Sequence, residues 1–160
     1  MNRQVVIVQP GRDGHRLTYV RHIAEAALEH GIGVHLLIGR RVLGATDYQL
    51  ELGSLIDGVQ VTVSEAFSVR EVATVARDLS VQHVVVPDGD KFAVEVGRTG
   101  SWPTIASLSV LVMRAKAQSS RGGPVASVVK GALKSHLLRR ANRLPGVTVF
   151  VLRNPLSDMS

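Results

Sequence analysis

The sequence predicts an α/β domain: a three-layer sandwich in which a mostly parallel sheet of about six to seven strands carries helices on both faces. Strand-like and helix-like segments alternate along nearly the whole chain. The strand-like segments are apolar throughout, which is typical of parallel strands covered on both faces. A length of 160 residues, 45% of them hydrophobic, suits one domain with a substantial aliphatic core.

The first half of the chain begins with an apolar run rich in Val and Ile, which predicts a strand over residues 4–9, ended by Pro10. Apolar residues at helical spacing predict a helix over residues 16–30, and Gly31 stands where helices commonly end. The same alternation then predicts a strand at residues 34–38, a helix at 46–56 and a strand at 59–63.

In the second half, Ser68 and Glu71 have the spacing of a capping box at the start of a helix. Pro124 suits the first turn of a long helix that ends near Asn142. We expect its apolar stripe to face the core: Val125, Val128, Val129, Ala132, Leu133 and Leu137. The remaining predicted elements are strands at residues 83–86, 107–113 and 147–152 and a helix that begins near Lys91.

The composition limits the cellular location of the protein and the kinds of site that it can contain. The chain has no cysteine, which excludes disulfides and thiolate metal sites and suits a reducing compartment. Its N-terminal apolar run is too short for a signal peptide, and no window approaches the roughly 18 apolar residues of a membrane span. A cytoplasmic location is expected, with a peripheral contact at the inner face of the membrane left open.

Charge is distributed unevenly along the chain. Residues 1–95 have a net charge of −3, whereas residues 96–160 have a net charge of +9 with Asp158 as their single acidic residue. A basic half suggests an anionic partner, although a solvated basic face would have the same composition. The helix between Lys130 and Arg143 is basic and could lie on an anionic membrane. Only 4% of residues are aromatic, which disfavours a nucleic-acid stacking surface.

Ligands of open parallel sheets bind at the carboxyl ends of the strands, and the first such loop is rich in glycine and basic residues. This loop contains Gly11, Arg12, Gly14, His15 and Arg16. Glycines allow close approach of backbone to a phosphate, and a helix N-terminus attracts anions. The loop lacks the Gly-x-Gly-x-x-Gly and P-loop patterns, and a simple tight turn is the alternative interpretation.

Two further strand ends carry polar side chains. Asp88 and Asp90 follow the strand at residues 83–86, where they could bind a sugar hydroxyl, bind a metal, act as a base, or cap the next helix. Arg114 follows the strand at residues 107–113 and suits a phosphate or carboxylate, or else a surface position. The six histidines show no metal spacing, and we expect His136 to be partly buried and hydrogen-bonded.

Several segments resemble family 4-type (group 1) glycosyltransferases, whose GT-B fold has two Rossmann-like domains. Residues 14–20 and 24–34 are similar to the family's opening, a glycine loop followed by a helix ending Ala-Leu-x-x-Gly and then a strand. Residues 84–90 and 111–114 are similar to strand ends of the family, and residues 149–155 to its last strand before the interdomain linker. The resemblance covers nearly the whole chain with loose motifs.

The resemblance implies a Rossmann-like N-terminal domain over residues 1–155, with residues 156–160 as a linker or tail and the C-terminal, donor-binding domain absent. It implies that the loop from Gly11 to Arg16 contacts the diphosphate of a nucleotide-sugar, and that the acceptor or sugar is contacted by Asp88, Asp90 and Arg114. No metal or other cofactor is implied. Family members often have histidine near the transferred sugar where this chain has Met113-Arg114, so no catalytic residue is assigned.

Three functional hypotheses follow. In the first, the chain contributes acceptor binding and part of an interdomain cleft to sugar transfer, and has little or no activity alone. In the second, it is a non-catalytic module that binds a nucleotide or another anion. In the third, it is an adaptor that works through its basic surface.

Overall fold

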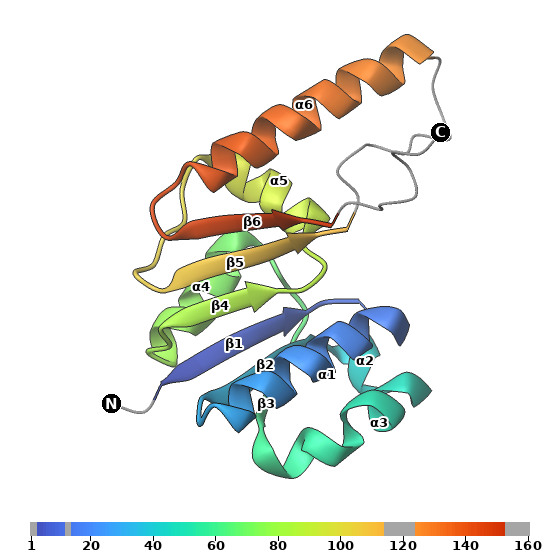
Figure 1. Cartoon of the computed structure of the whole chain (residues 1–160), viewed down its shortest axis with the longest axis vertical. Coiled ribbons are helices and arrows are strands. Elements are labelled where there is room, and N and C mark those ends of the chain that lie inside the picture. Colours follow the sequence, from blue (N-terminus) through green and yellow to red (C-terminus); the bar gives the residue numbers. More distant parts are fainter. Residues whose placement is uncertain (1–2, 12–13, 114–123, 153–160) are drawn as a thin grey trace.

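The computed structural model describes residues 3–11, 14–113 and 124–152 and confirms the α/β sandwich. Six strands form one all-parallel sheet in the order β3-β2-β1-β4-β5-β6 (Figure 1). The strands are β1 (Gln4–Gln9), β2 (Gly33–Gly39), β3 (Gln60–Ser64), β4 (His83–Val86), β5 (Ser107–Val112) and β6 (Val147–Val151).

Helices cover both faces of the sheet. The helices are α1 (Gly14–Glu29), α2 (Arg40–Leu43), α3 (Thr46–Leu52), α4 (Val69–Asp78), α5 (Asp90–Thr99) and α6 (Pro124–Asn142), with a 3-10 helix at Gly53–Gly58. The single helix predicted over residues 46–56 is therefore two shorter helices, and α2 was not predicted. Gly31, at φ +68°, follows α1 as expected, since glycine adopts the left-handed conformation without strain.

Successive residues of β1 point to opposite faces and divide the core into two clusters. Val5 and Ile7 pack with side chains of β2, α1 and α3. Val6 and Val8 pack on the other face with side chains of α4, α5 and α6. Because both faces of β1 are buried, its apolar run is continuous, as the parallel-sheet prediction requires.

The Ser68–Glu71 capping box is present at the start of α4. The Ser68 hydroxyl accepts a hydrogen bond from the Glu71 backbone N–H at 3.3 Å, and Glu71 accepts from the Ser68 backbone N–H at 3.0 Å. Hydrogen bonds from the Ser68 side chain and backbone lower the pKa of Glu71 below its ordinary value. The two residues thus fix where α4 begins, next to the carboxyl end of β3.

The α6 helix differs from its prediction. Its expected core stripe is largely uncovered, since Val128, Val129 and Leu133 are 70%, 61% and 57% exposed. His136, expected to be partly buried, is also exposed. The described part of α6 instead contacts the domain mainly through its second half, where Leu138 and Ala141 are buried.

We expect His83 to make the stability of the domain sensitive to mildly acidic pH. Its ring nitrogens contact the hydroxyls of Ser107 and Ser109 on β5, the second at 3.0 Å. Burial lowers the pKa of His83, because the charged imidazolium loses hydration. The stabilising contribution of neutral His83 is therefore present above the unfolded pKa of about 6.5 and is lost as the pH falls through the lower folded pKa.

We expect the midpoint of urea unfolding to decrease between pH 7.5 and pH 5, and to decrease less in His83→Gln, which has no ring to protonate. The matched control is His22→Gln, because His22 is exposed on α1. An equal pH dependence in the parent chain and His83→Gln would contradict this assignment.

Candidate functional site

The site lies where the chain order of the strands reverses, between β1 and β4. From β1 the chain builds β2 and β3 on one side of the sheet and then returns to add β4 on the other. The loops that leave the carboxyl ends of β1 and β4 diverge at this point, which leaves a crevice between them.

Gln9 and Arg16 hold the loop after β1. Gln9 is buried, and its side-chain amide donates a hydrogen bond to the Gly11 carbonyl at 2.6 Å. A side chain at Gly11 would have its Cβ 3.0 Å from Nη1 of Arg16, so the guanidinium lies directly against this glycine. Gly11 and Arg16, which belong to the same predicted loop, are therefore in contact, and their role toward a phosphate stays a prediction.

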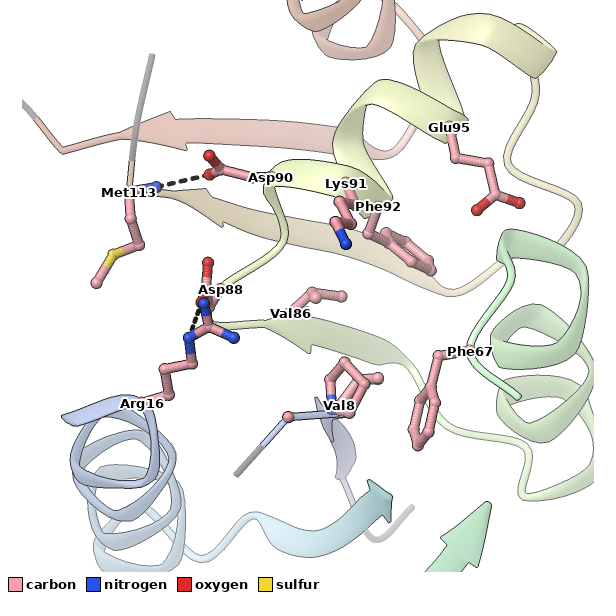
Figure 2. Close-up of a pocket in the computed structure, with 12 residues that line it drawn as sticks. Val8, Arg16, Phe67, Val86, Asp88, Asp90, Lys91, Phe92, Glu95 and Met113 are labelled. Carbon is pink, nitrogen blue, oxygen red and sulfur yellow. Dashed lines mark hydrogen bonds and ion pairs between the residues drawn. The ribbon is translucent and has the colours of Figure 1, made fainter. Parts of the chain in front are cut away.

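Arg16 reaches across the crevice to Asp88. Arg16 belongs to the first turns of α1, Asp88 follows β4, and the two side chains form an ion pair (Figure 2). The carboxylate is the less exposed partner, at 12% against 34% for the arginine side chain. The pair joins the two loops that border the crevice and holds the guanidinium at the end of α1 that favours anions.

Asp90 has a different set of partners. Its carboxylate accepts hydrogen bonds from the Met113 backbone N–H and from the Lys134 ammonium group, both at 2.9 Å. It therefore joins α5 to the end of β5 and to α6. Helix capping by Asp88 or Asp90 was the wrong interpretation, because the N-cap of α5 is Gly89 and no side chain caps it.

A cavity of about 650 Å³ opens beside these groups, a volume in the range of small-molecule sites. Figure 2 shows aromatic side chains toward one end of the cavity and charged side chains toward both. The Arg16–Asp88 pair lies at one end, with Asp90 and Met113 nearby. Phe67 and Phe92 lie toward the other, together with Lys91 and Glu95. The full lining is Val8, Pro10, Gly11, Arg16, Phe67, Val86, Asp88, Asp90, Lys91, Phe92, Glu95 and Met113.

Sequence reasoning missed Phe67, Glu95 and the role of Lys134. Phe67 lies in the loop after β3, so the rule that selects strand ends could have found it. Glu95 lies within α5, and one carboxylate oxygen accepts a hydrogen bond from the Val69 backbone N–H at 3.1 Å. Only the packing of α5 beside α4 makes this contact possible, so no local pattern indicates it.

Some predicted residues are not placed. Arg12 and Arg114 lie outside the described residues, as does the side chain of His15, while Gly14 is the first residue of α1. Among the residues that the structure describes, no three His, Asp or Glu side chains gather as a metal site would require. No helix in that part of the chain is long and apolar enough to cross a bilayer.

The fold and the site define a Rossmann-like α/β domain with a cavity at the switch point of its sheet. No family model and no curated protein matches the sequence. Solved structures do match it. Leucoanthocyanidin reductase from Vitis vinifera, solved with NADPH, has a TM-score of 0.56 and 14% identity, over 92% of this chain and 48% of the reductase.

Two other solved structures broaden the comparison. DmrB from Burkholderia xenovorans, described as a cubic protein cage for redox transfer, has a TM-score of 0.53 and 13% identity, over 98% of this chain and 90% of DmrB. MurG from Acinetobacter baumannii has a TM-score of 0.51 and 13% identity, over 97% of this chain and 46% of MurG. The chain thus spans about half the length of the reductase and MurG, and at these identities the likeness is one of fold.

Proposed function

We propose that this chain is the acceptor-side domain of a two-domain glycosyltransferase, and that its cavity binds the acceptor next to the diphosphate of a nucleotide-sugar. The observation that carries the proposal is the Arg16–Asp88 pair at one end of the cavity. It puts a cation and a carboxylate side by side at the switch point, where sugar transfer needs one group for phosphate and another for a hydroxyl.

The phosphate end is formed by Gly11, Arg16 and the N-terminus of α1. Glycine leaves room for backbone approach, and a guanidinium matches phosphate oxygens with a planar set of donors. Asp88 orients this guanidinium toward Gly11. The arrangement suits the diphosphate of a donor whose remaining contacts come from a second domain.

The hydroxyl end centres on Asp88 rather than Asp90. The hydrogen bonds of Asp90 to Met113 and Lys134 give it a structural role, whereas Asp88 borders the cavity beside Arg16. A carboxylate accepts hydrogen bonds from sugar or alcohol hydroxyls, which would hold the acceptor for transfer. The other end, where Phe67 and Phe92 lie with Lys91 and Glu95, then suits a part of the same acceptor that has both apolar and polar groups.

The comparisons with solved structures are compatible with this proposal and equally with other ligands. MurG is a GT-B glycosyltransferase, and the chain matches about half of it. The reductase, which was solved with NADPH, makes a nicotinamide dinucleotide the competing ligand, and DmrB, which was also solved in complex with FMN, makes a flavin a further candidate. The loop after β1 argues against the dinucleotide, because it lacks the Gly-x-Gly-x-x-Gly fingerprint.

A titration followed by amide NMR tests the proposal. The chain is titrated with a panel of nucleotide-diphosphate sugars, NADPH and FMN. We expect nucleotide-sugars to shift the resonances of Gly11, Arg16 and Asp88 with a Kd on the order of 1 mM, since one domain supplies only part of the site. Micromolar, stoichiometric binding of NADPH or FMN would instead establish a dinucleotide or flavin module and reject the glycosyltransferase proposal.

A further inference from the structure

The outward face of α6 combines exposed apolar and basic side chains. In Figure 1 the helix diverges from the sheet toward its N-terminal end and projects past the carboxyl ends of β5 and β6. Val128, Val129 and Leu133 lie on this projecting half and are more than half exposed. The helix is anchored further along, where Leu138 and Ala141 are buried and α5 approaches its backbone at Leu137.

Helical spacing divides this face along its length. At 3.6 residues per turn, Val128, Val129 and Leu133 fall within an arc of about 140° on one side of α6. Arg139, which is exposed, continues the same arc, and the exposed Arg143 directly follows the helix. The Arg140 guanidinium instead lies against Gly100 at the end of α5. The face is therefore apolar toward its N-terminal end and basic toward its C-terminal end.

This order of side chains fits an anionic bilayer better than other partners. Apolar side chains gain by entering the boundary between headgroups and acyl chains, and arginines gain from lipid phosphates. Nucleic acid would use the arginines and leave the exposed valines and leucine unexplained. A second copy of the chain, packed antiparallel on this face, would put the arginines of each copy against the apolar half of the other, where they lose hydration and gain no opposite charge.

We propose that the outward face of α6 docks on an anionic membrane surface, with Val128, Val129 and Leu133 at the acyl boundary and Arg139 and Arg143 on lipid phosphates. The proposal does not depend on the glycosyltransferase assignment. Because the apolar half projects on the side of the strand carboxyl ends, docking would bring the cavity edge of the domain toward the bilayer.

Vesicle flotation of the chain tests the proposal. We expect binding to phosphatidylcholine vesicles that contain phosphatidylglycerol, little binding to pure phosphatidylcholine, and weaker binding at higher salt. Val129→Ser with Leu133→Ser, and separately Arg139→Glu with Arg143→Glu, should each weaken binding at least about tenfold.

The controls make one change of each kind elsewhere. Leu50→Ser removes an apolar side chain that is 75% exposed on α3, and Arg70→Glu reverses an exposed charge on α4. Both should bind vesicles like the parent chain. Hydrogen exchange of the unmodified chain provides a measurement free of variants, in which anionic vesicles should protect amides of residues 128–133.

Three outcomes would overturn the proposal. The first is anionic-vesicle binding that neither α6 variant weakens. The second is dimerisation in sedimentation that the apolar variant abolishes, with no vesicle binding, because the face would then join two copies. The third is salt-sensitive binding to duplex DNA that only the charge variant abolishes, again with no vesicle binding.

Discussion

Gly97→Ala is expected to destabilise the domain by about 2 to 3 kcal/mol. Gly97 is buried on α5, and a Cβ at this position would lie 2.1 Å from the carbonyl oxygen of Leu137 on α6. The obstructing atom belongs to the backbone, so no side-chain rotation relieves the clash and α6 must move away from α5. Alanine favours helix over glycine by about 1 kcal/mol, which offsets only part of this cost.

The measurement is urea unfolding followed by circular dichroism. The matched control is Gly131→Ala on α6, where an added Cβ meets no atom within 4 Å. Only the helix propensity changes at this position, so we expect the free energy of unfolding to increase by about 0.5 to 1 kcal/mol. If Gly97→Ala were as stable as Gly131→Ala, α5 and α6 could not approach as closely as described.

Arg16→Ala is expected to weaken nucleotide-sugar binding at least about tenfold, the loss associated with one charge-assisted hydrogen bond. The substitution removes the guanidinium beside Gly11 and leaves the Asp88 carboxylate without its arginine. That carboxylate would then repel a phosphate instead of orienting a cation toward it. The affinity of Arg16→Lys for the nucleotide-sugar should lie between those of the parent chain and Arg16→Ala, because lysine keeps the charge and loses the planar donors.

Arg21→Ala is the control for this experiment. Arg21 lies on the same helix, has a side-chain exposure of 32% against 34% for Arg16, and also forms an ion pair, with Glu51 at 3.1 Å. Binding is compared by NMR titration well below the unfolding temperature of each variant, so that loss of stability is not counted as loss of affinity. Equal affinities of Arg16→Ala and Arg21→Ala would remove Arg16 from the proposed phosphate end.

Much of the candidate site follows from sequence order combined with one geometric rule. The rule that ligands bind at the carboxyl ends of parallel strands selected the loops that contain Gly11, Arg16 and Asp88. The structure adds that β1 and β4 are parallel neighbours, which brings these three residues together. The rule could not separate the roles of Asp88 and Asp90, because those roles depend on partners at positions 16, 113 and 134.

The sequence by itself determined the alternation of strands and helices, the all-buried character of the central strands, and local signals such as the capping box at Ser68 and the glycine after α1. These properties depend on side chains a few residues apart and on the period at which apolar residues recur. Only the tertiary structure decided which face of α6 is covered, since an apolar stripe of the same spacing serves a core or a partner surface equally well. It also decided the Arg16–Asp88 pair and the cavity, because both arise where segments distant in sequence meet at the switch point of the sheet.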